Sequence, residues 1–286
     1  MWDNSTSIFE ELLRPFCSKT KNPAFISAGF LAARSVLVLP LCIYVLYLGY
    51  RRWRQQHSFS HSDVFTHHLS LMEMFWPLGL ACYLHGSLSG NIVIKLVGTA
   101  SSSFVLFAEI MLHSLICVEW YLAVVHPVTY LMFRNQRGAR IRNISIGCVW
   151  LLCSGLISLQ RDLRSNYTVI LMFCFQAFAI LAVTFCCFSV LWVLLRPGPG
   201  KGGWEKVDQS KLRSFYTITA ITSVLWLWVV GFLLFYAVTK SSLLTETAGC
   251  ELIAGVNWLS LPTGLVAPLL YLQRAGKLSC CYFNHE

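Results

Sequence analysis

The sequence predicts an all-α membrane protein, a seven-transmembrane helix bundle followed by a short amphipathic eighth helix. Its 286 residues are 56% hydrophobic and only 12% charged, with a mean hydropathy of +0.60, whereas soluble domains average about 25% charged residues. Seven separate apolar stretches are long enough to cross a bilayer, which takes roughly 20 residues. The lysines and arginines gather in alternate connections between those stretches.

The seven apolar stretches follow one another without an internal repeat or a separate soluble domain. The second is the most polar, because it carries two histidines and a glutamate, and the third is long enough to cross with a strong tilt. They divide the chain into an N-terminal tail (1–23), a membrane domain (24–272) and a C-terminal eighth helix and tail (273–286). The predicted spans are residues 24–50, 63–84, 91–125, 143–160, 168–195, 214–239 and 250–272.

The basic residues orient the bundle. With the N-terminus outside, 14 of the 22 lysines and arginines lie in the inner connections and the C-terminal tail, and 6 lie outside, as the positive-inside rule requires. This bias explains most of the net charge of +9 and predicts contact with anionic lipid rather than with nucleic acid. The glycosylation sequons at Asn4 and Asn166 then fall outside, whereas the one at Asn143 falls at the inner edge.

Short motifs in the predicted helices add a resemblance. The stretch CVEWYLAVVHP, which contains Glu119, Trp120 and Tyr121, resembles the Asp/Glu-Arg-Tyr motif of the rhodopsin-like (class A) G-protein-coupled receptors. The stretch APLLY, with Pro268 and Tyr271, is similar to that family's Asn-Pro-x-x-Tyr motif of helix seven. Further landmarks follow in the family's order, namely Cys42 in LPLCIYVLYLGYRRWR, Glu73 in LSLMEMF and Trp150 in helix four.

The resemblance implies a receptor in the plasma membrane with an extracellular N-terminus. An extracellular ligand, which the motifs do not specify, would bind between the outer halves of the helices, and a heterotrimeric G protein would respond at the cytoplasmic face. The motif at 119–121 would serve G-protein coupling, and Pro268 and Tyr271 would form a switch in helix seven. Cys280 and Cys281, after the eighth helix, would be palmitoylated.

Several positions depart from the family's pattern. Trp120 stands where the family has Arg, so its side chain either packs inward in the space of that Arg or lies in the interfacial aromatic belt. Ala267 replaces the Asn of helix seven. Lys95 stands in place of the Cys at the start of helix three, so the family's bridge to the second outer loop is absent, and Cys17 with Cys250 is an alternative pair. Coupling that is weak, ligand-independent or lost is therefore left open.

Ionisable residues within apolar segments are costly to bury and are functional candidates for that reason. Glu73 matches the family's sodium-binding acid, and Glu109 falls where the family has a Ser of the same pocket, with His113 one turn further on. Two neighbouring carboxyl groups would share a proton, bind a cation such as sodium, or pair with His113 as an imidazolium. We predict a buried ion or proton site at these three residues; a neutral, hydrogen-bonded pair of core side chains is the alternative.

A second polar set lies nearer the outer face. Arg34 in the outer half of helix one, Lys95 at the top of helix three and Asn257 in helix seven predict a pocket for an anionic or polar ligand. The alternative is that the long basic side chains extend to the lipid headgroups.

The sequence predicts no enzyme, since it has neither a P-loop nor the Cys/His spacing of a zinc site. No resident cofactor is expected apart from the sodium ion considered above. Besides a signalling receptor, two other functions are open. One is the same fold without G-protein signalling, as a decoy, a chaperone or a heteromer subunit. The other is a small proton-coupled transporter, although transporters commonly show repeats and broken helix pairs that this chain lacks.

Overall fold

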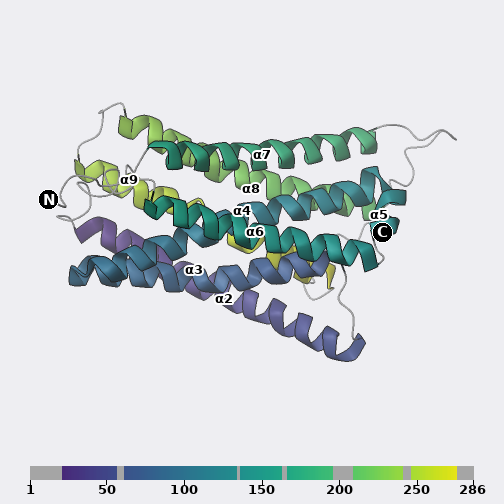
Figure 1. Cartoon of the computed structure of the whole chain (residues 1–286), viewed down its shortest axis with the longest axis horizontal. Coiled ribbons are helices and arrows are strands. Elements are labelled where there is room, and N and C mark those ends of the chain that lie inside the picture. Colours follow the sequence, from purple (N-terminus) through teal and green to yellow (C-terminus); the bar gives the residue numbers. More distant parts are fainter. Residues whose placement is uncertain are drawn as a thin grey trace, which may run out of the picture.

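The computed structural model describes residues 21–56, 61–133, 136–162, 166–195, 209–240 and 246–275, and the regular elements within these ranges are all α-helices. The long helices run side by side along one axis (Figure 1). In chain order the elements are α2 (Lys21–Gln56), α3 (His61–Ser89), α4 (Ile92–Val125), α5 (Pro127–Phe133), α6 (Gln136–Asp162), α7 (Asn166–Leu195), α8 (Gln209–Lys240), α9 (Glu246–Trp258) and α10 (Leu261–Arg274).

Helix α4 is the central element of the bundle, because it contacts α3, α6, α7 and α8. Helix α2 packs against α3 and also against α9 and α10, so the first and the last described helices are neighbours. The C-terminal part of α2 diverges from the other helices at the end of the bundle where α5 lies (Figure 1).

The predicted spans coincide with the long helices, one with each of α2, α3, α4, α6, α7 and α8, and the seventh with α9 and α10 together. Within the described residues, five helical stretches are long and apolar enough to cross a membrane, and α8 contains a shorter apolar stretch at Ile218–Gly231. Helix α3, the span predicted to be the most polar, is not among them. The five stretches are Phe25–Gln55, Ile92–Val125, Gly138–Ser158, Cys174–Val193 and Gly255–Gln273.

The seventh span differs from its prediction, because it is broken rather than continuous over 250–272. Helix α9 ends at Trp258 and α10 begins at Leu261, so Leu259 and Ser260 form a joint between them. The backbone N–H groups of these two residues donate to carbonyls three residues earlier, at 3.0 Å each. Pro262 lies in the first turn of α10, where a missing N–H does no harm, and it cannot continue the ladder of α9.

Two further features lie at the cytoplasmic end of the predicted topology. Helix α5, seven residues long, begins at Pro127 and was not predicted; Pro is favoured at the first position of a helix. The predicted eighth helix, with Cys280 and Cys281, lies almost wholly beyond Ala275, outside the described residues.

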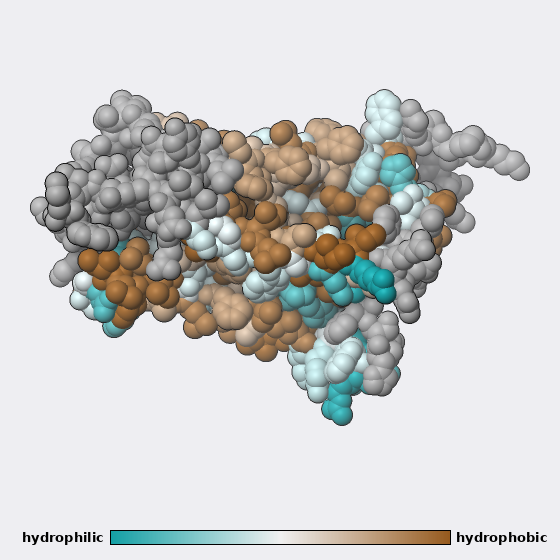
Figure 2. Space-filling view, viewed as in Figure 1, coloured by the Kyte–Doolittle hydropathy of each residue, from teal (hydrophilic) through white to brown (hydrophobic). Residues whose placement is uncertain are grey.

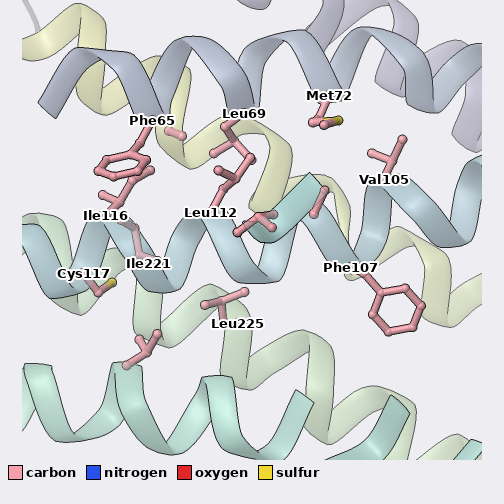
Figure 3. Packing of buried hydrophobic residues seen from close by; sticks show 14 of the residues in the cluster. Phe65, Leu69, Met72, Val105, Phe107, Leu112, Ile116, Cys117, Ile221 and Leu225 are labelled. Atoms are coloured by element: carbon pink, nitrogen blue, oxygen red, sulfur yellow. The ribbon is translucent and has the colours of Figure 1, made fainter. Parts of the chain in front are cut away.

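The main hydrophobic core joins α3, α4 and α8 at the middle of the bundle. Phe65, Leu69 and Met72 of α3 and Leu112 and Ile116 of α4 are buried, and Figure 3 shows the α3 side chains directed toward α4. Ile221 and Leu225 of α8 join this cluster from another side, and buried residues of α6 and α7 belong to it as well.

The outer surface of α7 is apolar along one whole face. Phe178, Leu181, Phe185, Phe188 and Trp192 recur at intervals of three and four residues, and each is more than half exposed. Figure 2 shows apolar residues across the middle of one side of the molecule and hydrophilic residues gathered near the C-terminal end of α2. A soluble protein rarely exposes so continuous an apolar face, whereas lipid would cover it.

Helices α3 and α4 form a close hairpin. Gly90 in the turn has a positive φ of 69°, which L side chains rarely adopt. Asn91 caps α4, accepting from the backbone N–H groups of Val93 and Ile94 at 3.0 and 3.3 Å. At Gly98 a Cβ atom would overlap the backbone of Tyr83, so this glycine permits the two helices to approach closely.

Candidate functional site

Arg34 of α2 is fully buried at the centre of a charged cluster. Its Nη2 lies 2.6 Å from Glu73 Oε2 on α3. Its Nη1 donates to the carbonyl and to the hydroxyl oxygen of Ser260, at 3.3 and 3.2 Å. The guanidinium Cζ lies 4.3 Å from the centre of the Trp76 ring, a cation–π contact. One side chain thus links α2, α3 and the α9–α10 joint.

Two ionisable residues of α4 complete the cluster. Glu109 Oε2 lies 3.6 Å from Arg34 Nη2, and Glu109 Oε1 lies 4.0 Å from His113 Nε2, one turn further along α4. Arg34, Glu73, Glu109 and His113 are each no more than 2% exposed. The structure therefore brings the three residues of the predicted ion or proton site together and adds a basic residue to them.

The local sequence explains why Arg34 points inward. Phe30, Arg34, Val38 and Cys42 recur every four residues on α2, and all four are buried. That spacing places them on one face of a helix. The face packs against α3, where the Phe30 and Trp76 rings meet edge to face at 5.1 Å and the Trp76 ring lies against the guanidinium group.

The prediction that Arg34 lines an outer pocket with Lys95 and Asn257 is wrong for Arg34, because Glu73 and Ser260 hold its side chain inside the bundle. Its extension to the headgroups is wrong for the same reason. Lys95 lies at the start of α4, with Nζ 5.8 Å from the centre of the Tyr83 ring. Asn257 is exposed on α9, and its carbonyl accepts from the Ser260 hydroxyl at 2.7 Å.

A sodium ion does not fit this set of residues. The Arg34 guanidinium already lies against both carboxyl groups, at 2.6 and 3.6 Å, so the positive charge is supplied by the chain itself. Hard cations prefer oxygen ligands converging from several sides. Here the oxygens of Glu73 and Glu109 converge on a nitrogen.

The Glu119–Tyr121 motif lies near the C-terminal end of α4. Trp120 is half-buried and packs against the main hydrophobic cluster, the inward arrangement of the two considered above. Arg142 of α6 lies near enough to Glu119 for electrostatic attraction. The Tyr121 hydroxyl is 3.3 Å from His126 Nε2, and its ring contacts that of Phe185 on α7.

Tyr271 of α10 is buried in a small cluster with Val45 and Leu48, toward the C-terminal end of α2. Its ring lies edge to face with His67 of α3, at 5.5 Å between centres, and the Arg52 guanidinium lies 5.6 Å from the ring centre. Arg52 is also 3.5 Å from Asp63, whose backbone carbonyl contacts His67 Nδ1. Pro268 is buried within α10. Helix α10 thus contacts α3 directly through Tyr271, and the joint before it is bonded to α2 through Ser260 and Arg34.

The remaining predicted sites fall at the limits of the described chain. Asn4, Cys17, Cys280 and Cys281 lie outside the described residues, and Asn166 is the first residue of α7. The proposed pairing of Cys17 with Cys250 accordingly stays a prediction.

Comparison with known proteins agrees with the motifs. No family model matches the chain. Over 189 residues it is 25% identical to mouse somatostatin receptor type 2, a class A G-protein-coupled receptor. The chain is distantly homologous to that receptor. The matched region covers 58% of this chain, and the chain spans about half of the receptor's length, 50%.

This similarity confirms the resemblance stated from the motifs at 119–121 and 267–271. The homologue belongs to a family of receptors rather than of enzymes, as the sequence analysis expects for this chain.

Proposed function

We propose that this chain is a seven-transmembrane receptor that passes an extracellular signal to a heterotrimeric G protein. The observation that carries the proposal is the homology to somatostatin receptor type 2, found in a chain whose helices occur in the order that the motifs predict. The ligand is a separate question, because half of that receptor's length lies outside the match.

In the proposed arrangement, α2, α3, α4, α6, α7, α8 and the α9–α10 pair cross the plasma membrane, with the N-terminus outside. The apolar face of α7 supports contact with lipid. The positive-inside rule supports the orientation, since it places the basic connections in the cytoplasm. Asn4 and Asn166 would then be glycosylated, and Cys280 and Cys281 palmitoylated.

The path from ligand to partner would run through the α9–α10 pair. A ligand near Lys95 and Asn257 would contact the outer ends of α4 and α9. The joint at Ser260 is bonded to Arg34, and Tyr271 further along α10 contacts His67 and Arg52. Movement of α10 would therefore displace the inner ends of α2 and α3, which it contacts. These ends lie beside the Glu119–Tyr121 motif, which would contact the G protein.

A receptor fold that does not signal is the second candidate, and Trp120 is the observation that favours it. An indole cannot form the charged contacts of the Arg found in the family. Here it packs into the core, and the neighbouring Glu119 interacts with Arg142 of another helix. Such a chain would act as a decoy or a heteromer subunit.

G-protein activation in cells, at matched surface expression, separates the two candidates. The native chain would be compared with empty cells, with Trp120→Arg, and with Trp53→Arg, a matched control at an exposed tryptophan of α2. We expect the native chain to raise the signal and Trp120→Arg to raise it further. A signal from Trp120→Arg alone favours the non-signalling candidate. No signal from any variant, together with no binding of the purified chains to G protein, contradicts both the coupling and its loss through Trp120.

A further inference from the structure

We propose that the buried cluster holds one resident proton, on the carboxyl group of Glu109, while Arg34 serves as its fixed cation. The cluster is then electrically neutral and takes up no free metal ion. The cluster is thus a binding site for a proton, and this property does not depend on whether the chain signals.

Charge balance is the first step. Among the described residues, the ionisable side chains in contact at this site are Arg34, Glu73, Glu109 and His113, and all four are excluded from solvent. With both carboxyl groups ionised and His113 neutral, the cluster would carry one net negative charge. An unbalanced charge inside a bilayer is costly. One more positive charge is therefore needed.

The position of Arg34 decides which carboxyl group stays ionised. Glu73 accepts a hydrogen bond from Arg34 at 2.6 Å, a short charge-assisted contact. Glu109 lies 3.6 Å from the same nitrogen, beyond the usual hydrogen-bond range, and its carboxyl group interacts with that of Glu73 instead. Glu73 is thus the better stabilised anion, and Glu109 is the one that retains a proton.

His113 is the other group that could carry the charge, and its geometry argues against it. The ring nitrogen nearest to Glu109 is 4.0 Å away, too far for a hydrogen bond. Among the described residues, no side chain accepts a hydrogen bond from either ring nitrogen, and the other polar group beside the ring is the backbone of Thr263. A buried imidazolium whose carboxylate neighbour lies beyond hydrogen-bond distance would be poorly stabilised, so we assign the neutral form to His113.

A protonated Glu109 also satisfies its neighbour. Glu73 Oε1 lacks a hydrogen-bond partner among the described residues, and the two carboxyl groups interact directly. The O–H of Glu109 supplies a donor between α3 and α4. The other polar groups beside the cluster are Cys42 on α2, Ser70 on α3, and Ser260 and Thr263 at the start of α10, and we assign each its uncharged form.

Infrared spectroscopy of the purified chain in lipid nanodiscs at neutral pH tests the proposal, because a protonated carboxyl group has its own carbonyl band, which shifts in D2O. We expect one such band in the native chain and its loss in Glu109→Gln, whereas Glu251→Gln, at an exposed position on α9, should retain it. Glu109→Asp should move the band further than Glu73→Asp does, because only the first substitution changes the protonated group itself.

Two further comparisons keep the proposal falsifiable. Replacing sodium chloride by choline chloride should change neither the band nor the thermal midpoint, because Arg34 supplies the cation. Arg34→Gln should roughly double the band, since both carboxyl groups then need protons; if this variant does not fold, the Glu109 comparisons still decide. A native chain without the band, a band that persists in Glu109→Gln, or a midpoint that rises with sodium would overturn the proposal.

Discussion

Gly264 of α10 faces the carboxyl group of Glu73 so closely that a Cβ atom at position 264 would lie 2.8 Å from Glu73 Oε2. Glu73 cannot withdraw without lengthening its ion pair with Arg34. We therefore expect Gly264→Ala to lower the free energy of unfolding by about 1–3 kcal/mol, measured from thermal unfolding of the purified chain. The matched control is Gly255→Ala on α9, where a Cβ atom meets nothing within 4 Å. Equal effects of the two substitutions would contradict the close contact.

The two members of the buried ion pair, Arg34 and Glu73, should differ in how much stability is lost when each is replaced. Removing one partner of a buried pair costs about 3–5 kcal/mol, because the other group must then be buried unpaired or give up its charge. Arg34→Gln should show the full loss of stability. Glu73→Gln should show less, since Glu109 lies 3.6 Å from Arg34 and can replace the lost acceptor. Thermal midpoints and surface expression measure this order, and a larger loss in Glu73→Gln would refute it.

The close approach of α3 and α4 gives a third prediction. At Gly98 a methyl group would overlap the backbone of Tyr83, which cannot move aside as a flexible side chain would. We expect Gly98→Ala to cost about 1–3 kcal/mol and to reduce the yield of folded chain. At Gly147 of α6 a Cβ atom meets nothing within 4 Å. Gly147→Ala should accordingly leave the melting temperature within error of the native value; a comparable drop there would remove the steric explanation.

The N-terminal cap of α4 can be tested by two substitutions of Asn91, one that removes the acceptor and one that keeps it. Asn91 accepts from two backbone N–H groups at the start of the helix. Asn91→Ala should lower stability by about 1 kcal/mol. Asn91→Asp should retain the native stability, because a carboxylate accepts the same bonds and favours a helix N-terminus. Thermal unfolding of the three chains side by side gives the answer, and identical values for Ala and Asp would exclude a capping role.

Glycan mapping tests the proposed orientation. We expect Asn4→Gln and Asn166→Gln each to remove one glycan, seen as a mobility shift that disappears after enzymatic deglycosylation. Asn143→Gln should have no effect, since that sequon would face the cytoplasm. A glycan at Asn143 would show that the bundle is inserted the other way round.

The positions of the long helices could be predicted from the sequence because each depends on a local property, the length of an apolar stretch. The joint in the seventh span was missed, although its signal was present: Ser260 and Pro262 together resemble a helix start. Hydropathy averaged over about twenty residues hides a two-residue interruption.

The partners of Arg34 illustrate what local patterns do not contain. The spacing of Phe30, Arg34, Val38 and Cys42 could have shown that Arg34 shares a face with apolar residues. Its contacts with Glu73 and with Ser260, 226 residues away, depend on how α2 is rotated against three other segments. The sequence groups Glu73, Glu109 and His113 but indicates no cation for them, because that rotation follows from the packing of the whole bundle.

The hairpin of α3 and α4 has a consequence for how the chain is made. Helix α3 contains Glu73 and two adjacent histidines, and it is not among the stretches apolar enough to cross a membrane by themselves. Helix α4 is apolar enough to cross by itself, and only Gly90 and Asn91 separate the two helices. We therefore expect α3 to leave the translocation channel together with α4, as a preformed pair. In that pair α4 would shield Glu73 from lipid until Glu73 forms its ion pair with Arg34 of α2. Biogenesis of this protein would then proceed by hairpins, and a ribosome stalled between α3 and α4 should leave α3 exposed to the cytosol.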